Sequence, residues 1–309
     1  MTTSHNNNNL LEGVSPNHKS GFVNIVGNPN VGKSTLMNRL VGDKLSIITS
    51  KAQTTRHRIL GIVNTPEMQI VYSDTPGVLA PHYKLQDDML AASMSALGDA
   101  DVLLYVTDTV ETPDKHGRFV EAVSQVACPV IVIINKIDLT NQQQLEALVQ
   151  QWNERLPKAE VWPISALHGA GIQQIQKRIA ELLPLSPPYF EKDALTDRPA
   201  RFFVAEIIRE KIFLYYQKEI PYSCEVVIES FKEHPDIIHI HALIYVERET
   251  QKRIIIGHKG AALKKVSTMA RKDIEAFFGK KVFLQTFVKV EPNWRDKERA
   301  LLNFGYRHD

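Results

Sequence analysis

The most informative stretch of this 309-residue sequence is GNPNVGKST, residues 27–35. It fits the pattern G-x-x-x-x-G-K-[ST] and lies between a strand-like apolar run (22–27) and a helical pattern (33–41). Glycines let such a loop wrap around a phosphate, and amide N–H groups at the helix start bind the anion. We expect Lys33 to reach the β- and γ-phosphates and the Ser34 hydroxyl to bind Mg²⁺. The sequence thus predicts a nucleoside triphosphate site, with Asn28, Asn30, Val31, Gly32 and Thr35 as further contacts.

DTPG, residues 74–77, follows the apolar run at 68–73. An Asp at the end of a buried strand can hold the Mg²⁺ shell through a water molecule, and the amide of the Gly can bond the γ-phosphate. The tetrapeptide is common in turns, so its weight comes from its position after the phosphate-binding loop. Asp74 and Gly77 are therefore expected beside Lys33 in the catalytic centre.

NKID, residues 135–138, ends the apolar strand at 130–134 and indicates which base is bound. Guanine presents N1–H and a 2-amino group as donors, and the Asp138 carboxylate can accept both hydrogen bonds. Adenine lacks this donor pair, so binding it would leave Asp138 unpaired. Asn135 is expected on the acceptor side of the base, with Lys136 lying along its plane and bracing the phosphate-binding loop.

SAL, residues 165–167, follows the strand-like run at 160–164. The backbone N–H of Ala166 is placed to donate to O6 of guanine, with Ser165 and Leu167 on either side of it. The phosphate-binding loop, DTPG, NKID and SAL occur in this order, which favours a GTP-binding protein over an ATPase.

Residues 21–185 alternate strand-like runs with helical patterns, which predicts a doubly wound α/β domain with a mostly parallel sheet. The strands are expected at 22–27, 59–63, 68–73, 102–107, 130–134 and 160–165, and the helices near 33–41, 85–97, 116–126, 142–155 and 171–183. Only NTPE separates the second and third strands. These residues are too few for a crossover, so that pair is expected to be an antiparallel hairpin.

The rest of the chain divides into three parts. Residues 1–20 are polar and Asn-rich, and we expect a disordered extension. The proline-rich segment 186–200 is expected to be a linker. Residues 201–309 show a different order of elements, typical of a small α+β domain. Its helices are expected near 201–218, 260–278 and 295–304, and its strands near 224–231, 237–247 and 282–290.

The composition is that of an ordinary globular protein, with 43% hydrophobic and 23% charged residues and a net charge of +2. No apolar run has the length of a membrane helix, and the N-terminus has neither the basic start nor the apolar core of a signal peptide. The two cysteines are far apart, which excludes a disulfide framework and fits a reducing cytosol. The sequence predicts a cytoplasmic protein.

These motifs and several longer segments together resemble the Era family of bacterial P-loop GTPases, which act in ribosome assembly. The segments are KAQTTRHRILGI (51–62), RFFVAEIIREKI (201–212), LIYVERETQKRIIIGHKGAALKKV (243–266) and RALLNFGYR (299–307). The resemblance covers about residues 21–307. It implies a P-loop GTPase domain over 21–185 and a KH domain of type II, with a C-terminal helix, over 201–309.

The resemblance also places Thr54 and Thr55 in the first switch segment. It implies Thr55 as a Mg²⁺ ligand, because related families keep the Thr directly before Arg. Val78 stands where many small GTPases carry a Gln that orients the attacking water. An apolar side chain cannot do this, so hydrolysis is expected to be slow or to rely on another group. Arg56, His57 and Arg58 could supply charge, but solvated loop residues are the favoured interpretation.

A second candidate site lies in the basic part of the chain. Nine Lys and Arg fall within residues 252–281, against Asp273 and Glu275, which suits a polyanion-binding surface or a merely solvated helix face. G-x-x-G at 257–260 opens a helix and resembles the KH clamp, which holds about four single-stranded nucleotides. The expected RNA contacts are Ile256, Gly257, His258, Lys259, Gly260, Lys264, Lys265 and Arg271.

The KH resemblance makes two further points. It implies a short helix at 253–256, where periodicity alone favours a strand. It also implies that the RNA is the 3′ region of small-subunit ribosomal RNA, so that the 30S subunit is the partner. On the helix at 260–278, the apolar stripe that we expect to be buried is Leu263, Val266, Ala270, Ile274 and Phe277.

Three interpretations of the whole chain are compatible with these patterns. The favoured one is a monomeric GTP-hydrolysing assembly factor that uses GTP/GDP and Mg²⁺ and whose rRNA affinity changes on hydrolysis. A second is a nucleotide-gated binding module, and a third is a signalling GTPase whose basic patch faces anionic lipid. No lipidation motif supports the third, which leaves a weak association with the inner face of the membrane as a minor expectation. Asn30 is a candidate K⁺ ligand, or a turn-stabilising residue after Pro29.

Overall fold

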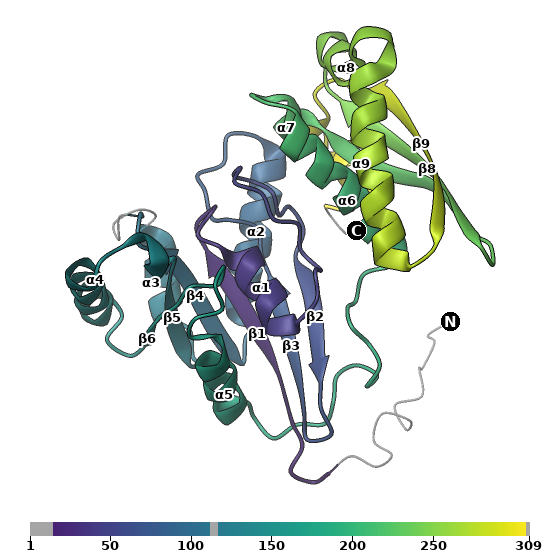
Figure 1. Cartoon of the computed structure of the whole chain (residues 1–309). Helices are drawn as coiled ribbons and strands as arrows, with labels where there is room; N and C mark the ends of the chain where they lie inside the picture. The colour runs from purple at the N-terminus through teal and green to yellow at the C-terminus, as the bar shows by residue number, and fades with distance from the viewer. Residues whose placement is uncertain (1–14, 112–116, 307–309) are drawn as a thin grey trace. The chain divides into compact units, whose positions relative to one another are not determined.

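The computed structural model describes residues 15–111 and 117–306, which belong to two compact units (Figure 1). The first unit runs to Ser46 and includes Thr55–Leu79 and Met89–Asp197. The second unit begins at Arg198 and also takes in two short segments of the first half of the chain, Ile47–Thr54 and Ala80–Asp88. No helix within these described ranges is both long and apolar enough to cross a membrane.

The first unit is built on a six-stranded sheet in the order β2-β3-β1-β4-β5-β6. Its strands are β1 (Lys19–Gly27), β2 (Ile59–Asn64), β3 (Met68–Asp74), β4 (Val102–Asp108), β5 (Val130–Asn135) and β6 (Glu160–Pro163). All neighbours are parallel except β2 and β3, which form the expected antiparallel hairpin. Every residue of β4 is buried, as a sheet covered on both faces requires. The predicted doubly wound sheet is confirmed.

The helices of the first unit are α1 (Lys33–Val41), α2 (Lys84–Gly98), α3 (Gly117–Ser124), α4 (Gln142–Arg155) and α5 (Ile172–Leu182), although α2 as far as Asp88 belongs to the second unit. Figure 1 shows α1 and α5 in front of the sheet. On the opposite face, side chains of α2, α3 and α4, among them Ala96, Phe119 and Trp152, pack on Tyr105 of β4 and its neighbours. This layering leaves the ends of β1, β3 and β5, where the motifs lie, at one edge of the sheet.

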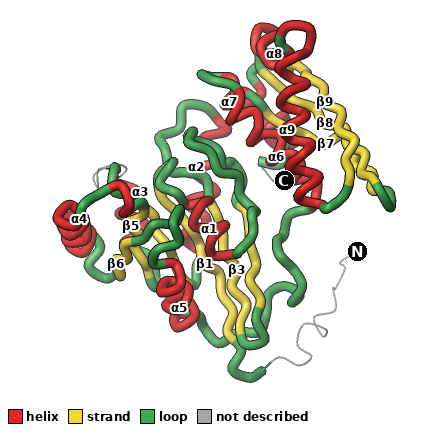
Figure 2. Tube along the Cα trace, in the orientation of Figure 1, coloured by secondary structure: helices red, strands yellow, loops and turns green. Residues whose placement is uncertain are grey.

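The second unit contains the three-stranded sheet β7-β8-β9 and the helices on one of its faces, which Figure 2 shows in yellow and red. Its elements are α6 (Ala200–Tyr215), α7 (Ile220–Ser223), β7 (Glu225–Glu233), β8 (Ile237–Val246), α8 (Glu249–Ile256), α9 (Ala261–Phe278), β9 (Lys281–Val290) and α10 (Glu298–Asn303). Strand β8 pairs antiparallel with β7 and parallel with β9. The α+β KH fold of type II is thereby confirmed.

The short helix implied at 253–256 exists as the last turn of α8, so the strand that periodicity favours there is wrong. The side chain of Gln251 accepts hydrogen bonds from the backbone N–H groups of Glu247 and Arg248, 3.0 Å each, and so caps the start of the helix. Within the helix Ile255 is buried and Ile254 is 49% exposed. A run of three isoleucines is therefore no evidence for a strand when a capping residue precedes it.

Two segments that we expected to be unstructured are in part ordered. Strand β1 already begins at Lys19, and His18 before it is buried, with its Nδ1 2.9 Å from the carbonyl of Ser186; residues 1–14 lie outside the described residues. The proline-rich segment lies along the hairpin instead of hanging free. The N–H of Ile62 donates to Leu195 (2.8 Å), and the Gln69 amide donates to the carbonyl of Phe190 (2.8 Å).

Candidate nucleotide and RNA sites

The phosphate-binding loop joins the end of β1 to the start of α1, and its backbone requires glycine at two positions. Gly27 has φ 144°, and a Cβ there would lie 2.1 Å from the carbonyl oxygen of Val106. Gly32 has φ 98°, and a Cβ there would lie 2.2 Å from Nδ2 of Asn135. The loop thus passes too close to its neighbours for any side chain at these positions.

The Lys33 side chain lies inside this loop and is only 6% exposed. Nζ donates to the carbonyls of Gly27 (3.0 Å) and Asn28 (2.7 Å). The Asn28 side chain in turn donates to the carboxylate of Glu111. Burial lowers the pKa of Lys33 to about 8, against the opposing effect of the Asp74 and Glu111 charges.

This lowered pKa gives a testable pH dependence. Bound phosphates would keep the Lys33 amine protonated, so the pKa of Lys33 rises when the nucleotide binds. Above pH 8 the complex therefore carries more protons than the free protein. At pH 8.5 we expect GDP binding to take up about 0.8 proton, and at pH 7.0 only about 0.1. Calorimetry in two buffers of different ionisation enthalpy measures the uptake. Lys33→Met, measured at saturating nucleotide, should abolish it; the same uptake in this variant would contradict the assignment.

Three oxygen-bearing side chains meet beneath the loop. The Ser34 hydroxyl donates to Oδ2 of Asp74 (2.7 Å) and lies 2.9 Å from the Thr55 hydroxyl. Asp74 is completely buried, which raises its pKa, while Lys33 and the neighbouring hydroxyls oppose the rise. Its other oxygen, Oδ1, is buried with no hydrogen-bond partner among the described residues. A buried carboxylate with a free oxygen and two hydroxyls beside it is a donor set that fits Mg²⁺.

The two threonines of the first switch segment, Thr54 and Thr55, have different hydrogen-bond partners. Thr54 is engaged locally, because its hydroxyl lies 2.7 Å from the carbonyl of Lys51 and 2.7 Å from the Thr49 hydroxyl. Thr55 instead contacts Ser34. The arrangement supports Thr55 as the metal ligand, as the family resemblance implied.

Gly77 approaches the phosphate-binding loop closely, since a Cβ on it would lie 2.7 Å from Cα of Pro29. Its backbone is therefore near the place of a terminal phosphate. The next residue, Val78, is 3% exposed and packs into the hydrophobic core with Val26 and Ala96. Its side chain does not face the phosphate site, so it neither orients nor contacts an attacking water.

The arginines after Thr55 are not the solvated loop residues that we favoured. Arg56 is 2% exposed. Arg58 binds Asp99 (2.6 Å), the Ser73 hydroxyl (2.6 Å) and the side-chain oxygen of Asn24 (3.0 Å). The partners of Arg58 lie on the interior strands β1 and β3 and directly after α2, so its charge links these elements and is not available to a phosphate.

At the end of β5, Asn135 connects two loops. Its Nδ2 donates to the carbonyl of Val31 (2.8 Å), and its Oδ1 accepts from the N–H of Ala166 (2.9 Å). These two bonds fix the orientation of the Asn135 amide at the position where contact with the base is expected. Lys136 braces the phosphate-binding loop as predicted, because Nζ donates to the carbonyl of Asn30 (2.6 Å) and pairs with Asp108.

Asp138 is held in place by the SAL segment. Its Oδ1 accepts from the Ser165 hydroxyl at 2.5 Å, and this bond lowers the pKa of the carboxyl. Sequence reasoning missed Arg39 of α1, which donates to the carbonyls of Ala166 (3.1 Å) and Leu167 (2.7 Å) and anchors the same segment. No local pattern indicates this contact, because 127 residues separate its partners.

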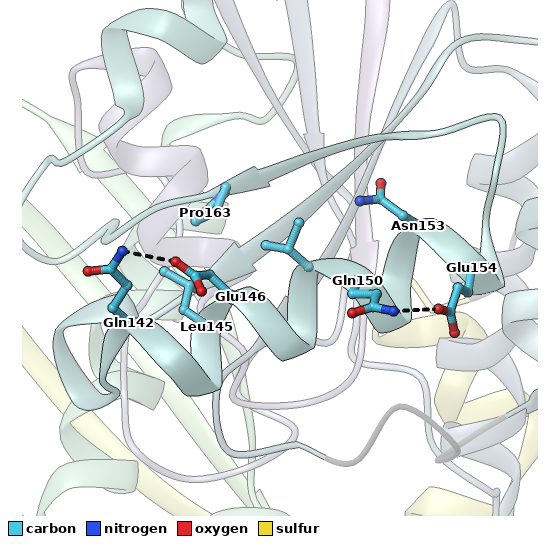
Figure 3. A pocket seen from close by; sticks show the side chains of 8 residues that line it. Gln142, Leu145, Glu146, Gln150, Asn153, Glu154 and Pro163 are labelled. Atoms are coloured by element: carbon cyan, nitrogen blue, oxygen red, sulfur yellow. Dashed lines mark hydrogen bonds between the residues drawn. The ribbon is translucent and has the colours of Figure 1, made fainter.

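A surface groove of about 620 Å³ lies elsewhere on the first unit, between α4 and β6 (Figure 3). Leu145, Val149 and Pro163 form its apolar floor. The carboxylates at its rim are each paired with a glutamine of the same helix, Gln142 with Glu146 and Gln150 with Glu154, both at 2.9 Å. None of the nucleotide motifs contributes to this groove.

The G-x-x-G segment forms a tight turn ahead of α9. Gly257 has φ 70°, and a Cβ on it would lie 2.6 Å from Cβ of Ala262. Lys259 and Gly260 also have positive φ, 48° and 78°. Beside the turn is a groove of about 310 Å³ between α9 and β9. It is lined by Gly260, Leu263, Lys264, Ser267, Thr268, Arg271, Leu284 and Thr286.

The expected RNA residues fall into two sets. Lys264 and Arg271 line the groove, whereas the Lys265 amine lies 5.0 Å from the ring centre of Tyr215 and is not among the lining residues. The apolar stripe of α9 also ends differently than expected, at Phe278 instead of Phe277. Val266, Ala270 and Ile274 are buried and Leu263 is half-buried, but Phe277 is 44% exposed and stacks on Phe203 at 5.5 Å.

Comparison with known proteins agrees with this pairing of sites. A family model described as 50S ribosome-binding GTPase matches residues 22–136, and a KH domain model matches residues 219–295. GTPase Era of Geotalea uraniireducens is 45% identical over 93% of this chain and 98% of its own length. GTPase Era of Pseudomonas aeruginosa is 47% identical over 93% and 95%. The chain belongs to the Era family of GTPases.

Two solved Era structures superpose on this Era-family chain with a TM-score of 0.90 at 40% identity, covering 94% of this chain and 100% of theirs. One is Era in complex with MgGDPNP and nucleotides 1506–1542 of 16S ribosomal RNA. The other is a single-residue variant of Aquifex aeolicus Era bound to GDP·AlF4⁻. The match includes both the GTPase and the KH portions of the Era-family chain.

Proposed function

We propose that this chain is an assembly factor for the small ribosomal subunit, which binds GTP with Mg²⁺, hydrolyses it, and holds the 3′ region of small-subunit rRNA in its KH domain. The observation that carries the proposal is the cluster of Ser34, Thr55 and the partnerless buried oxygen of Asp74 beneath the phosphate-binding loop. The KH groove on the same chain supports the RNA part. The relative solved with MgGDPNP and 16S rRNA binds both kinds of ligand.

Each residue of the nucleotide site has a role in this proposal. Ser34 and Thr55 would hold Mg²⁺ directly and Asp74 through water, and the ion would neutralise charge on the β- and γ-phosphates. Lys33 and the loop N–H groups bind the same phosphates, and the Gly77 N–H bonds the γ-phosphate. Asp138 accepts from the guanine N1–H and 2-amino groups.

The chain connectivity suggests how hydrolysis changes RNA affinity. Ile47–Thr54 ends directly before Thr55, and Ala80–Asp88 begins shortly after Gly77. Both segments are grouped with the KH unit. Because Thr55 and Gly77 serve the Mg²⁺ and γ-phosphate side of the nucleotide, loss of that phosphate releases the residues that adjoin these two segments.

The proposal is tested by measuring affinity for an RNA of the 16S 3′ sequence with GDPNP and with GDP bound. A difference of at least about tenfold is expected, and equal affinities would contradict switching by hydrolysis. Crosslinking in cells, followed by sequencing of the bound RNA, should enrich the 3′ region of small-subunit rRNA. Enrichment of unrelated RNAs instead would favour a general nucleotide-gated RNA-binding module.

Potassium is a further part of the proposal. Asn30 has φ 64° at the exposed tip of the phosphate-binding loop, and its side-chain oxygen is a hard donor that suits K⁺ near the phosphates. Since Val78 cannot supply a catalytic amide, a cation there would offset charge between the β- and γ-phosphates. We expect faster hydrolysis in KCl than in NaCl at equal ionic strength. Equal rates, or a K⁺ effect that survives Asn30→Ala, would remove this role.

Two smaller points complete the proposal. The chain acts as a monomer in the cytoplasm, which sedimentation with and without nucleotide tests. The basic side chains near the G-x-x-G turn also suit anionic lipid, so a weak contact with the inner face of the membrane is included. Co-sedimentation with vesicles of anionic and of neutral lipid checks that contact.

A further inference from the structure

The two faces of the KH sheet are covered differently. Helices α6 and α9 pack on one face. On the other face the C-terminal segment seals one end: Trp294 is completely buried, donates from Nε1 to the carbonyl of Ser223 (2.9 Å) and contacts the ring of Phe304 at 5.4 Å. Phe304 in turn lies 5.1 Å from Tyr245 of β8. The remainder of this second face, which we call the open face, carries exposed aromatic rings.

Two phenylalanines of β9 project from the open face. Phe283 is 46% exposed and Phe287 is 51% exposed. They are four residues apart on one strand, hence on the same side and roughly 13 Å from each other. His239, the register partner of Phe283 on β8, has its ring 5.3 Å away, and the ring of His234 follows at 5.2 Å. The rings of Phe283, His239 and His234 therefore form a continuous surface across β9, β8 and the end of β7, and Phe287 extends the aromatic surface further along β9.

Lysines border these rings. Lys232 on β7 pairs in register with His239, Lys281 comes two residues before Phe283, and Lys289 two residues after Phe287. All three lysines are exposed. Two carboxylates lie near them: that of Glu229, 4.0 Å from the Lys289 amine, and that of Glu275, whose charge interacts with Lys281. Three ammonium groups against these two carboxylates leave the border with a positive charge, which suits a polyanion.

Strand β9 connects the open face to the candidate RNA groove. Leu284 and Thr286 line the groove on the helix side of β9, while their neighbours Phe283 and Phe287 point to the other side. In the described part of the chain β9 is an edge strand, paired with β8 alone. An RNA strand that leaves the groove can pass over this edge and reach the rings.

We propose that the open face is a second RNA surface, which binds single-stranded RNA continuing from the groove by stacking bases on Phe283 and Phe287. The proposal rests on the proposed function, since it extends the same RNA beyond the clamp. A G-x-x-G clamp holds about four nucleotides, whereas the relative's complex contains nucleotides 1506–1542. Stacking on exposed rings is tolerant of sequence, and the bordering lysines meet the phosphates.

The test compares a short and a long RNA. A five-nucleotide RNA that fills only the groove, and a twelve-nucleotide RNA that extends it on both sides, are titrated against the parent and Phe283→Thr/Phe287→Thr. Thr suits a strand, so the sheet should be retained. We expect affinity for the long RNA to fall about 100-fold, about tenfold per ring. Affinity for the short RNA should stay unchanged.

Two controls separate stacking from other effects. Phe283→Tyr/Phe287→Tyr should retain binding of the long RNA, and Phe277→Thr, at a similarly exposed ring on α9, should affect both RNAs equally or neither. Unchanged affinity of the Thr variant for the long RNA would overturn the proposal. So would an equal loss for both RNAs, or a change of oligomeric state that marks the face as a contact between copies. If the parent binds neither RNA, the proposed function itself fails.

Discussion

Replacing Asp138 by Asn is expected to weaken GTP binding at least about 100-fold, because an amide cannot accept hydrogen bonds from both the N1–H and the 2-amino group of guanine. The 2-amino group would face the N–H of the new amide, donor against donor. Xanthine carries an oxo group at that position, which accepts from the amide. We therefore expect the variant to prefer XTP over GTP, whereas the parent prefers GTP.

Titration of GTP, XTP and ATP against both proteins measures this reversal. The gain in XTP affinity serves as the folding control, since a damaged site would lose every nucleotide. Ser165→Ala provides the matched comparison: it removes the 2.5 Å bond that holds Oδ1 of Asp138 but leaves both acceptor oxygens. That variant should lose GTP affinity without gaining any for XTP. Unchanged GTP affinity in Asp138→Asn would exclude Asp138 from the base site.

The doubly wound fold of the first unit could be predicted from local patterns, whereas for the second unit they indicated only an α+β domain, and the family resemblance identified it as a KH domain. The phosphate-binding loop, for example, lies within nine consecutive residues, and the glycines that its backbone requires, Gly27 and Gly32, are part of the motif. The antiparallel hairpin of β2 and β3 could also be predicted, because a four-residue connection is too short for a crossover between parallel strands. In the isoleucine run of α8 the periodicity favours a strand. The family resemblance was needed to predict the helix there, since the capping by Gln251 is not evident from the sequence.

Contacts between residues distant in sequence could not be predicted. Arg39 anchors the SAL segment, and Arg58 binds Asp99, through bonds that only the folded sheet brings together. The same limit applies to the proline-rich segment: its prolines correctly exclude helix, but nothing in it shows that Leu195 accepts a bond from Ile62. Phe277 fits the helical spacing of a buried stripe, yet it is exposed and its neighbour Phe278 packs on the core and on Phe231 of β7 instead. Helical periodicity indicates which face of a helix is apolar, but not which residues at the end of that face are buried.

RNA binding by the second unit and GTP binding by the first unit should be separable by substitution. Replacing both His258 and Lys259 by Asp should abolish binding of single-stranded RNA, because two carboxylates would oppose the RNA phosphates at the turn. GTP affinity should remain at the parent value. The turn itself should survive, since Lys259 has φ 48° and Asp is among the residues that tolerate this region best. RNA binding is measured by titration at several salt concentrations.

For the parent, the logarithm of RNA affinity should fall with the logarithm of salt concentration, with a slope of about 0.7 for each phosphate contacted. Gln143→Asp/Lys158→Asp makes the same change of net charge on the first unit and should leave RNA affinity nearly intact. This control matters because a more acidic protein binds any polyanion less well. Normal RNA binding by the turn variant would refute the KH assignment, and an equal loss in the control would attribute the effect to net charge. Loss in the turn variant alone would locate the phosphate clamp at residues 257–260.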